Sequence, residues 1–560
     1  MAVKNRKEKK SFSENNPLQP TVTNVEKEES IATTKDKYAH IMTTEFDFLT
    51  EMLCTDRVIQ LLIIMMTGHL FYLQNYSKET NSIVTDNSSI GIIFNSLISF
   101  VCCLAIFIKK DVHKWNLTNF DSTFFNLFYL FLVPMALTFY YLPTEYLALT
   151  GTLILNSLPI NAPLRIPLMG IFMIFQLPTN IYNYYDLRLH FFKSIVVNFV
   201  IEYALYYISG QRKSLSIVET NMFSIILTYV TYVIDSPLNI PFQILQKSMY
   251  ALVATFVLQL LYILVLKFVF NANIKQKSPF AKLIGFGMTI SAFPTFLFYF
   301  LNTLPGVFNT NHENPAVWLL LFLTETDSRL TILSIWGVLI FATIPLLTGY
   351  VYEGDVSLNF SRKFWHFLLL AIIVFPWKYD PDLVKVALSG IISVFFIIET
   401  LRLCGFLPEF VILILNKFAD YRDQRGPLLI SYLYLIIGAS FPILLDDDII
   451  GIILLGLGDS VASIVGQKFG KKYWADSNEE NKKTYEGTVA FVLVCYFFEL
   501  AYDFYLSENE VVQFVKGYDW NKSLFSFANF LVAGILEGNA TLNDNVLLPA
   551  YSMILKKLLK

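Results

Sequence analysis

The chain has 560 residues, of which 55% are hydrophobic and only 16% are charged, and it contains 51 Phe and 31 Tyr. This composition is too apolar for a soluble protein of this length, and it predicts an all-α, polytopic helical bundle in a membrane. The formal net charge of −3 argues against a nucleic-acid partner. The five cysteines follow neither a disulfide framework nor a zinc pattern, so we expect them in the membrane core.

Residues 1–45 are rich in Lys, Glu, Ser, Thr and Asn, which predicts a disordered cytosolic tail. No apolar segment follows the first basic residues, so we expect an uncleaved anchor near 58–76 in place of a cleaved signal sequence. Glycosylation sequons at Asn75 and Asn87 follow this anchor, whereas basic residues lie in the tail and in the second link. Basic residues stay in the cytosol, so we expect a cytosolic amino terminus and a lumenal 77–89 link.

Apolar runs then alternate with short polar links, and we expect roughly 14 to 18 membrane crossings. The expected spans lie near 90–108, 124–141, 145–160, 163–178, 192–209, 222–236, 248–270, 281–301, 316–324, 331–350, 364–377, 384–401, 406–417, 427–445, 448–466, 488–506, 523–536 and 545–556. We expect an amino-terminal multi-span region over 46–350 that carries little chemistry. A second membrane domain over 351–560 is expected to carry most of it.

Segment 458–488, GDSVASIVGQKFGKKYWADSNEENKKTYEGT, begins as a membrane helix and ends as a polar loop. Asp459, Ser463, Gly466 and Gly470 recur at helical spacing and share one face. The following loop brings cations, a hydroxyl, a carboxylate and a third glycine at Lys471, Lys472, Lys482, Lys483, Thr484, Glu486 and Gly487. A metal-bound triphosphate needs ammonium groups, a carboxylate for the cation, and glycines where the backbone approaches closely.

Each part of this segment also has a simpler explanation. Gly466 and Gly470 are four residues apart, and such glycines allow two membrane helices to pack closely. Paired lysines beside a membrane are usually a solvated cytoplasmic flank. The combination with Asp459 at the apolar end is what favours a phosphate site.

Two other stretches place polar residues beside apolar runs. In SRKFWH, Arg362, Lys363 and His366 project toward overlapping faces of a helix. This pattern is also typical of a basic membrane flank, but the histidine favours an anion site. In EGNATLNDN, Glu537 and Asp544 are candidates to bring a second carboxylate to the cation or to the attacking hydroxyl.

GDSVASIVGQKFGKK followed by KKTYEGT resembles the signature of the CTP-dependent polyprenol kinases and phosphatidate cytidylyltransferases. RKFWH, YRDQRGPLLISYLYLIIG and EGNATLNDNVLLP, with the long apolar amino-terminal half, resemble the eukaryotic dolichol kinase family. The resemblance covers about residues 355–556 by motif and the remainder by hydropathy alone. The HGG and DRxD elements of a typical phosphatidate cytidylyltransferase are not found in the carboxyl-terminal part.

The resemblance implies that CTP phosphorylates dolichol to give dolichyl phosphate and CDP for protein glycosylation. It also implies a multi-pass protein of the endoplasmic reticulum membrane, surrounded by membrane lipids, with its active loop facing the cytosol. On this hypothesis Asp459 holds Mg²⁺ or another divalent cation, with Asp544 or Glu537 as a second ligand. Asp459 and His366 both remain candidates for the base that accepts the alcohol proton.

The remaining residues have the following hypothetical roles. Arg362 and Lys363 approach the transferred group together with His366. Lys471, Lys472, Lys482 and Lys483 are assigned to the phosphates of the nucleotide, and Thr484 and Gly487 to hydrogen bonds with it. Gly466 and Gly470 would allow the backbone to approach the nucleotide closely. Glu486 would order the loop or reach the nucleotide.

Two alternatives remain at this stage. A cytidylyltransferase would use the same triphosphate site but release pyrophosphate. A transporter would explain many spans and isolated intramembrane charges, but not the clustering of lysines, glycines and carboxylates in one loop. No GxxxxGK[ST] motif is present, so we expect no P-loop ATP site. The oligomeric state and the preferred polyprenol length are left open by the sequence.

Overall fold

The computed structural model describes residues 76–77, 82–83, 166–171, 185–211, 213–215, 217–233, 239–269, 278–303, 314–353, 358–417, 426–474, 483–507, 519–539 and 544–559. Every described residue lies within residues 59–560. The expected tail and first anchor, Lys482 and the sequon asparagines lie outside the described residues. The expected domain boundaries stay predictions.

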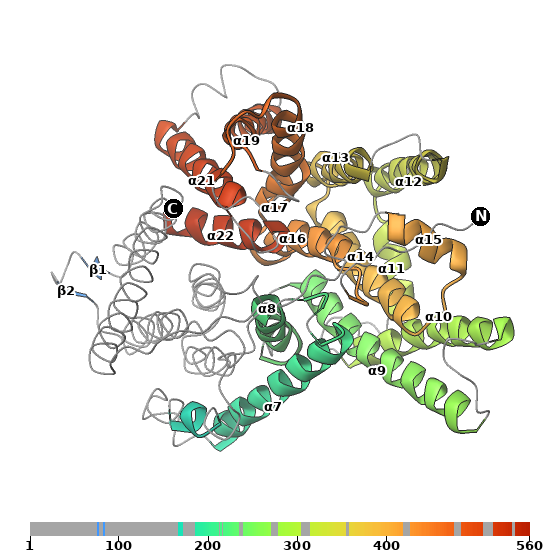
Figure 1. Cartoon of the computed structure of the whole chain (residues 1–560). Coiled ribbons are helices and arrows are strands. Elements are labelled where there is room, and N and C mark those ends of the chain that lie inside the picture. The colour runs from blue at the N-terminus through green and yellow to red at the C-terminus, as the bar shows by residue number, and fades with distance from the viewer. Residues whose placement is uncertain are drawn as a thin grey trace, which may run out of the picture. The chain divides into compact units, whose positions relative to one another are not determined.

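The described residues are almost entirely helical (Figure 1). The helices are α7 (Tyr185–Ile208), α8 (Ile217–Thr228), the π-helix η3 (Tyr229–Val233), α9 (Ile240–Phe268), α10 (Pro279–Asn302), α11 (Pro315–Thr324), α12 (Asp327–Glu353), α13 (Leu358–Trp377), α14 (Pro381–Leu403), α15 (Glu409–Lys417), α16 (Ser431–Asp446), α17 (Ile450–Ile452), the π-helix η6 (Ile453–Gly458), α18 (Asp459–Phe469), α19 (Tyr485–Leu506), α21 (Trp520–Asn539) and α22 (Asp544–Leu559). One antiparallel pair, β1 (Tyr76–Ser77) with β2 (Ser82–Ile83), is the exception among the described residues.

Within the described residues, five helical segments are long and apolar enough to cross a membrane: Ile240–Phe268, Pro279–Asn302, Pro381–Leu403, Ile450–Phe469 and Tyr485–Leu506. Three shorter apolar helical segments accompany them. These segments confirm the predicted class, a polytopic helical membrane protein. The expected total of crossings stays a prediction, because most of the first 184 residues lie outside the described part.

Apolar runs in the sequence locate the described helices closely. The run expected at 316–324 forms α11, where Asn314 caps the amino end by accepting a hydrogen bond from Ala316 N. The run expected at 448–466 is not one regular helix, because it divides into α17, η6 and α18. This interruption directly precedes Asp459 and therefore matters for the site.

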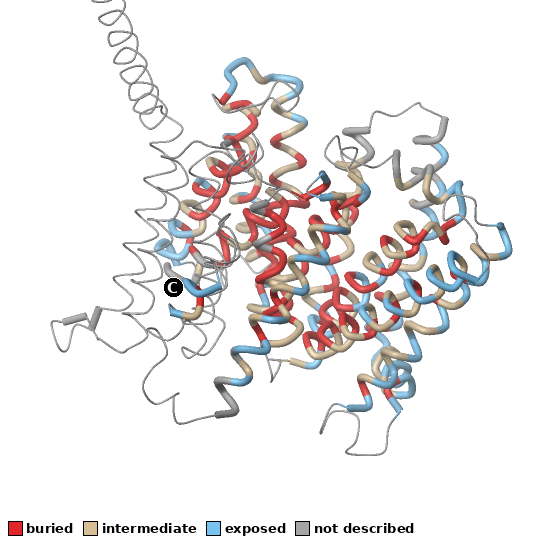
Figure 2. The backbone as a smooth tube through the Cα atoms, turned by 60° about the horizontal axis from the view of Figure 1, so that its bottom comes forward, coloured by how far each residue is buried: buried red, intermediate tan, exposed pale blue. Residues whose placement is uncertain are grey.

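Buried polar side chains join the helices of the described core. Ser393 of α14 donates to Ser248 of α9 at 2.6 Å, and Gln259 of α9 donates to Thr289 of α10 at 2.7 Å. Within an apolar environment such bonds hold helices together, since packing against lipid gives little hydrophobic driving force. Helices α16, α17 and η6 are buried on nearly all sides, whereas α9 and α10 expose an apolar face. Figure 2 shows the buried residues gathered in the middle of the described helices and the exposed residues toward the outside.

Two lysines form ion pairs at the corner between α16 and α17, where Asp446, Asp447 and Asp448 follow one another in the sequence. Lys385 of α14 pairs with Asp447 at 2.6 Å, and Lys556 of α22 pairs with Asp448 at 2.7 Å. Asp448 also accepts a hydrogen bond from Ile450 N at the start of α17. Asp447 and Asp448 therefore anchor the corner from which α17 and η6 lead to Asp459.

Lys556→Met is expected to destabilise the protein. Asp448 is 8% exposed, and Glu499 lies 3.9 Å from the same ammonium, so the variant leaves carboxylates buried without their cation. Removing one partner of a buried ion pair costs about 3–5 kcal/mol. Thermal unfolding in detergent measures the effect. Lys522→Met is the control, because its ammonium is largely exposed and 3.7 Å from Asp503; equal melting temperatures for the two variants would contradict the prediction.

Candidate active site

Asp459 begins α18, directly after the π-helix η6. Two glycines of η6 allow close approach by neighbouring helices. A Cβ added to Gly456 would lie 3.0 Å from Leu370 of α13, and one added to Gly458 would lie 2.7 Å from the ring of Phe491 in α19. A π-helical turn changes the direction of the residues that follow it and is frequent at functional sites. Asp459 therefore emerges between α13 and α19 at a closely packed point.

His366 of α13 contacts both η6 and Asp459. Its Nδ1 atom lies 2.8 Å from the carbonyl oxygen of Leu455 and 3.4 Å from Asp459 Oδ2. A carbonyl oxygen only accepts, so Nδ1 carries the proton and donates it to Leu455. The imidazole is 5% exposed. His366 therefore holds α13 against η6 and stands beside the carboxylate.

Lys363, one turn before His366, forms an ion pair with the Asp459 side chain. Its Nζ atom lies 2.7 Å from Asp459 Oδ2 and 3.4 Å from the carbonyl oxygen of Asp459. The side chains of Lys363 and Asp459 are only 12% and 16% exposed. A charge-assisted bond in such a partly buried place is stronger than one on the surface. The structure thus brings together three predicted site residues from α13 and α18.

Lys483 makes a second ionic group with residues of α21 and α22. Its Nζ atom lies 3.0 Å from Glu537 Oε1, 2.8 Å from Asp544 Oδ2 and 2.6 Å from the carbonyl oxygen of Glu537. Burial alone would lower the pKa of Lys483, but the facing carboxylates of Asp544 and Glu537 outweigh it and raise that pKa above 10.5. The ammonium is therefore charged at neutral pH.

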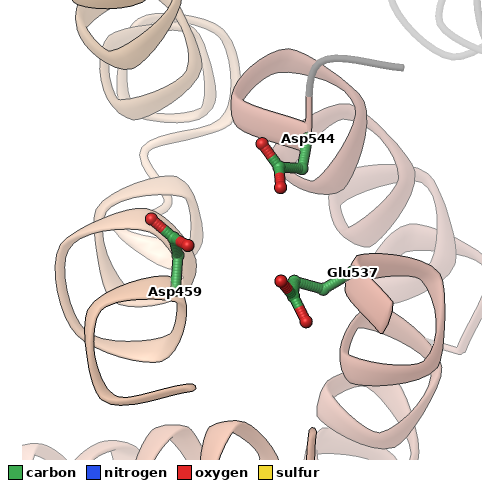
Figure 3. Close-up of side chains that lie close together, drawn as sticks. All are labelled: Asp459, Glu537 and Asp544. Carbon is green, nitrogen blue, oxygen red and sulfur yellow. The ribbon is translucent and has the colours of Figure 1, made fainter. Parts of the chain in front are cut away.

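Three carboxylates meet between these two lysines. Asp459, Glu537 and Asp544 each offer an oxygen, and the three oxygens all lie within 4.8 Å of one another. Figure 3 shows the three side chains directed toward a common space from α18, α21 and α22. We call these residues the carboxylate cluster. Three hard oxygen ligands at this spacing fit a divalent cation such as Mg²⁺, which prefers carboxylates and water.

The ends of the polar loop are clamped beside the cluster. Trp474 N donates to the carbonyl oxygen of Lys483, and Tyr485 N donates to that of Lys472, both at 3.0 Å. The buried Trp474 ring packs 4.1 Å from the Tyr485 ring, and its Nε1 donates to Thr488 Oγ1 at 3.0 Å. This antiparallel pairing fixes the position of Lys483, although loop residues 475–482 lie outside the described part.

The glycines of segment 458–488 lie where α18 meets the start of α19. A Cβ on Gly466 would lie 2.9 Å from Thr484 Oγ1, and one on Gly487 would lie 2.8 Å from the carbonyl oxygen of Ala462. A Cβ on Gly470 would also meet the Thr484 side chain. Helix packing therefore accounts for these glycines, as the simpler explanation supposed, and their contact with a nucleotide stays a prediction.

Gly487→Ala is expected to lower stability by about 1–3 kcal/mol, because the new methyl group meets backbone that cannot move aside. Its control is Gly390→Ala in α14, where an added Cβ meets nothing within 4 Å. There we expect no loss, and up to about 1 kcal/mol of gain from helix propensity. Melting temperatures of both variants in detergent check this. Equal stability of the two would show that α18 and α19 are less tightly packed than described.

The other predicted residues lie outside the carboxylate cluster. Lys471 and Lys472 are exposed, and Glu486 accepts a weak hydrogen bond from Lys472 N at 3.4 Å. Thr484 caps α19 by accepting from Gly487 N at 3.1 Å. Arg362 is half-buried in α13. Their proposed roles toward a nucleotide stay predictions.

Sequence reasoning missed two contributors to the site. Trp474 and the Leu455 carbonyl hold the loop and His366 in place, yet neither is a charged residue in a recognisable pattern. Gly538 is the one signal for Trp474, because a Cβ there would collide with the indole Nε1. That signal appears only once α21 is known to face the loop.

Together these features define a polytopic helical membrane protein with a polar centre suited to a metal-bound polyphosphate. A family model described as the dolichol kinase N-terminal domain matches residues 4–235. This match lies in the half of the chain where the sequence motifs are sparse.

Curated relatives extend the match over most of the chain. Dolichol kinase of Saccharomyces cerevisiae is 34% identical over 509 residues, which cover 89% of this chain and 88% of that protein. The dolichol kinase of Schizosaccharomyces pombe is 32% identical over 296 residues, covering 47% of this chain and 56% of that protein. Human dolichol kinase is 30% identical over 280 residues, covering 45% and 49%. No solved structure matches the chain.

The chain therefore belongs to the dolichol kinase family. The relatives' names agree with the resemblance drawn from the sequence motifs and disfavour both a cytidylyltransferase and a transporter.

Proposed function

We propose that this chain transfers the terminal phosphate of CTP to the hydroxyl of dolichol, giving dolichyl phosphate and CDP. The observation that carries the proposal is the carboxylate cluster flanked by Lys363 and Lys483, in a chain 34% identical to a dolichol kinase. Phosphoryl transfer needs little covalent help from the protein and depends on positioning and charge neutralisation. Carboxylates position a divalent cation on the triphosphate, and ammonium groups neutralise charge on the phosphates.

Asp459, Glu537 and Asp544 would hold the divalent cation, which we take to be Mg²⁺. When bound, the cation would neutralise charge on the triphosphate and orient it for in-line attack. The fit rests on three converging carboxylate oxygens within 4.8 Å of one another. Lys363 and Lys483 limit the negative charge of the cluster, so that a metal–nucleotide complex with net negative charge is not repelled.

The cations of the loop would complete the nucleotide site. Lys471 and Lys472 are exposed immediately after α18, as expected of groups that meet a soluble polyanion. Lys482 lies at the other end of the same loop, and we assign it the same task as Lys471 and Lys472. Thr484, Glu486 and Gly487 form the amino end of α19, where a helix dipole favours anions.

The acceptor alcohol would reach this centre from the bilayer. Asp459 lies ten residues before Phe469, and thus about 15 Å along the helix from the end of an apolar segment. The terminal phosphorus forms a bond to the alcohol oxygen as its bond to the bridging oxygen of CDP breaks. The alcohol proton passes to Asp459 or to His366, which stand side by side.

We further propose that the protein resides in the endoplasmic reticulum membrane with loop residues 471–488 facing the cytosol. Basic residues flank the two apolar segments at this end, at Lys468, Lys471, Lys472, Lys482 and Lys483. Positively charged flanks stay on the cytosolic side, where CTP is also found. The reaction would supply the lipid carrier of protein glycosylation.

Incubating purified protein with dolichol, Mg²⁺ and CTP labelled at the terminal phosphate tests donor, acceptor and reaction type together. We expect labelled dolichyl phosphate and unlabelled CDP, and little product from labelled ATP. Release of labelled pyrophosphate with a cytidylated lipid would instead show a cytidylyltransferase. Equal use of ATP would contradict the proposed donor.

A further inference from the structure

The two lysines beside the carboxylate cluster differ in how many of their donors are used. An ammonium group has three N–H donors and no acceptor. Lys483 Nζ faces three oxygens at hydrogen-bond distance: the carbonyl oxygen of Glu537 at 2.6 Å, Glu537 Oε1 at 3.0 Å and Asp544 Oδ2 at 2.8 Å. Every donor of Lys483 therefore has an acceptor.

Lys363 has only one residue as its partner. Its Nζ atom lies 2.7 Å from Asp459 Oδ2 and 3.4 Å from the carbonyl oxygen of the same residue. Within the described part of the chain it has no further acceptor, so one N–H is left over. Its side chain is 12% exposed, and it projects from α13 toward Asp459 at the start of α18.

Lys483 also has little freedom to change partners. Its carbonyl oxygen accepts from Trp474 N, and the next residue, Thr484, caps α19. Contact with a phosphate would require its ammonium to leave Glu537 and Asp544, whose side chains are 8% and 25% exposed. Those two carboxylates would then lose the cation that balances their charge in a partly dehydrated place.

We propose that Lys483 is a positioning residue that holds Glu537 of α21 and Asp544 of α22 in one cluster, and that Lys363 contacts the phosphate chain of the nucleotide. This inference rests on the proposed function and deepens it. The sequence alone assigned Lys483 to the phosphates with the other loop lysines, and it placed Lys363 near the transferred group; the inference separates Lys483 from the phosphate contacts.

Equilibrium binding of CTP and of CMP to the purified full-length protein, with saturating Mg²⁺ and without dolichol, separates the two roles. In the native protein CTP is expected to bind more tightly than CMP, because its longer phosphate chain finds cationic partners. Lys363→Met is expected to reduce this preference by about tenfold or more, the equivalent of one charge-assisted hydrogen bond. Lys483→Met is expected to keep the native preference.

A second readout reports on the metal ligands directly. Mn²⁺ binding without nucleotide, measured from the paramagnetic resonance signal of free Mn²⁺, is expected to become about tenfold weaker in Lys483→Met, because Glu537 and Asp544 are no longer held beside Asp459. The control Lys522→Met changes a largely exposed lysine and is expected to bind both CTP and Mn²⁺ like the native protein.

The proposal is overturned if Lys483→Met loses the preference for CTP as fully as Lys363→Met, or if its Mn²⁺ affinity is unchanged or tighter. If Lys483→Met alone does not fold, the charge-balanced double variant Lys483→Met with Glu537→Gln replaces it and must still keep the preference for CTP. A native protein that did not distinguish CTP from CMP would instead contradict the proposed function itself.

Discussion

Asp459→Asn is expected to reduce transfer of phosphate from CTP to dolichol by about a thousandfold while the protein level is retained. Asn keeps the size of the side chain but removes the charge that faces Lys363 at 2.7 Å and that would bind the metal. The measurement is labelled dolichyl phosphate formed by membranes containing matched amounts of each protein.

The matched control for Asp459→Asn is Asp382→Asn, at a 69% exposed side chain in the first turn of α14. It also removes one negative charge, but from an exposed residue that does not belong to the carboxylate cluster, so we expect the native rate of turnover. If Asp459→Asn turned over at the native rate, Asp459 would be neither a metal ligand nor the base that accepts the alcohol proton.

Glu537→Gln is expected to raise the Mg²⁺ concentration for half-maximal activity about tenfold and to lower the rate at saturating Mg²⁺ about a hundredfold. The change removes one of three negative ligands, but it leaves Lys483 paired with Asp544 at 2.8 Å. A Mg²⁺ titration of the initial rate at saturating CTP gives both quantities.

The control for Glu537→Gln is Glu409→Gln, because Glu409 is 84% exposed and pairs only with Lys282, at 3.3 Å, among the described residues. We expect it to leave the titration curve in place. If Glu537→Gln also left the Mg²⁺ requirement unchanged, Glu537 would serve only to hold Lys483, and the cation would depend on other ligands.

The described helices were largely predictable because each membrane span corresponds to a continuous run of apolar residues in the sequence. The run at 488–506 becomes α19, which starts at Tyr485 once Thr484 provides the cap. The π-helix η6 was not predictable, because its geometry depends on α13 and α19 approaching Gly456 and Gly458 from elsewhere in the chain.

The site was predictable in its residues more than in its contacts. Asp459, Glu537 and Asp544 were singled out as carboxylates beside apolar runs, and the structure brings their oxygens together. The partners of Lys483 were not visible, because Glu537 and Asp544 lie 54 and 61 residues further along the chain. Pairing between residues so far apart in the sequence depends on how α19, α21 and α22 pack, and no short sequence pattern predicts that packing.

Diffraction from crystals grown with Mn²⁺, CTP and the native protein, recorded at the manganese absorption edge, tests the central claim most directly. The account predicts an anomalous peak among the carboxylates of Asp459, Glu537 and Asp544, at about 2.0–2.3 Å from their oxygens and next to the triphosphate. A peak bound only by CTP and water, away from these three side chains, would contradict it.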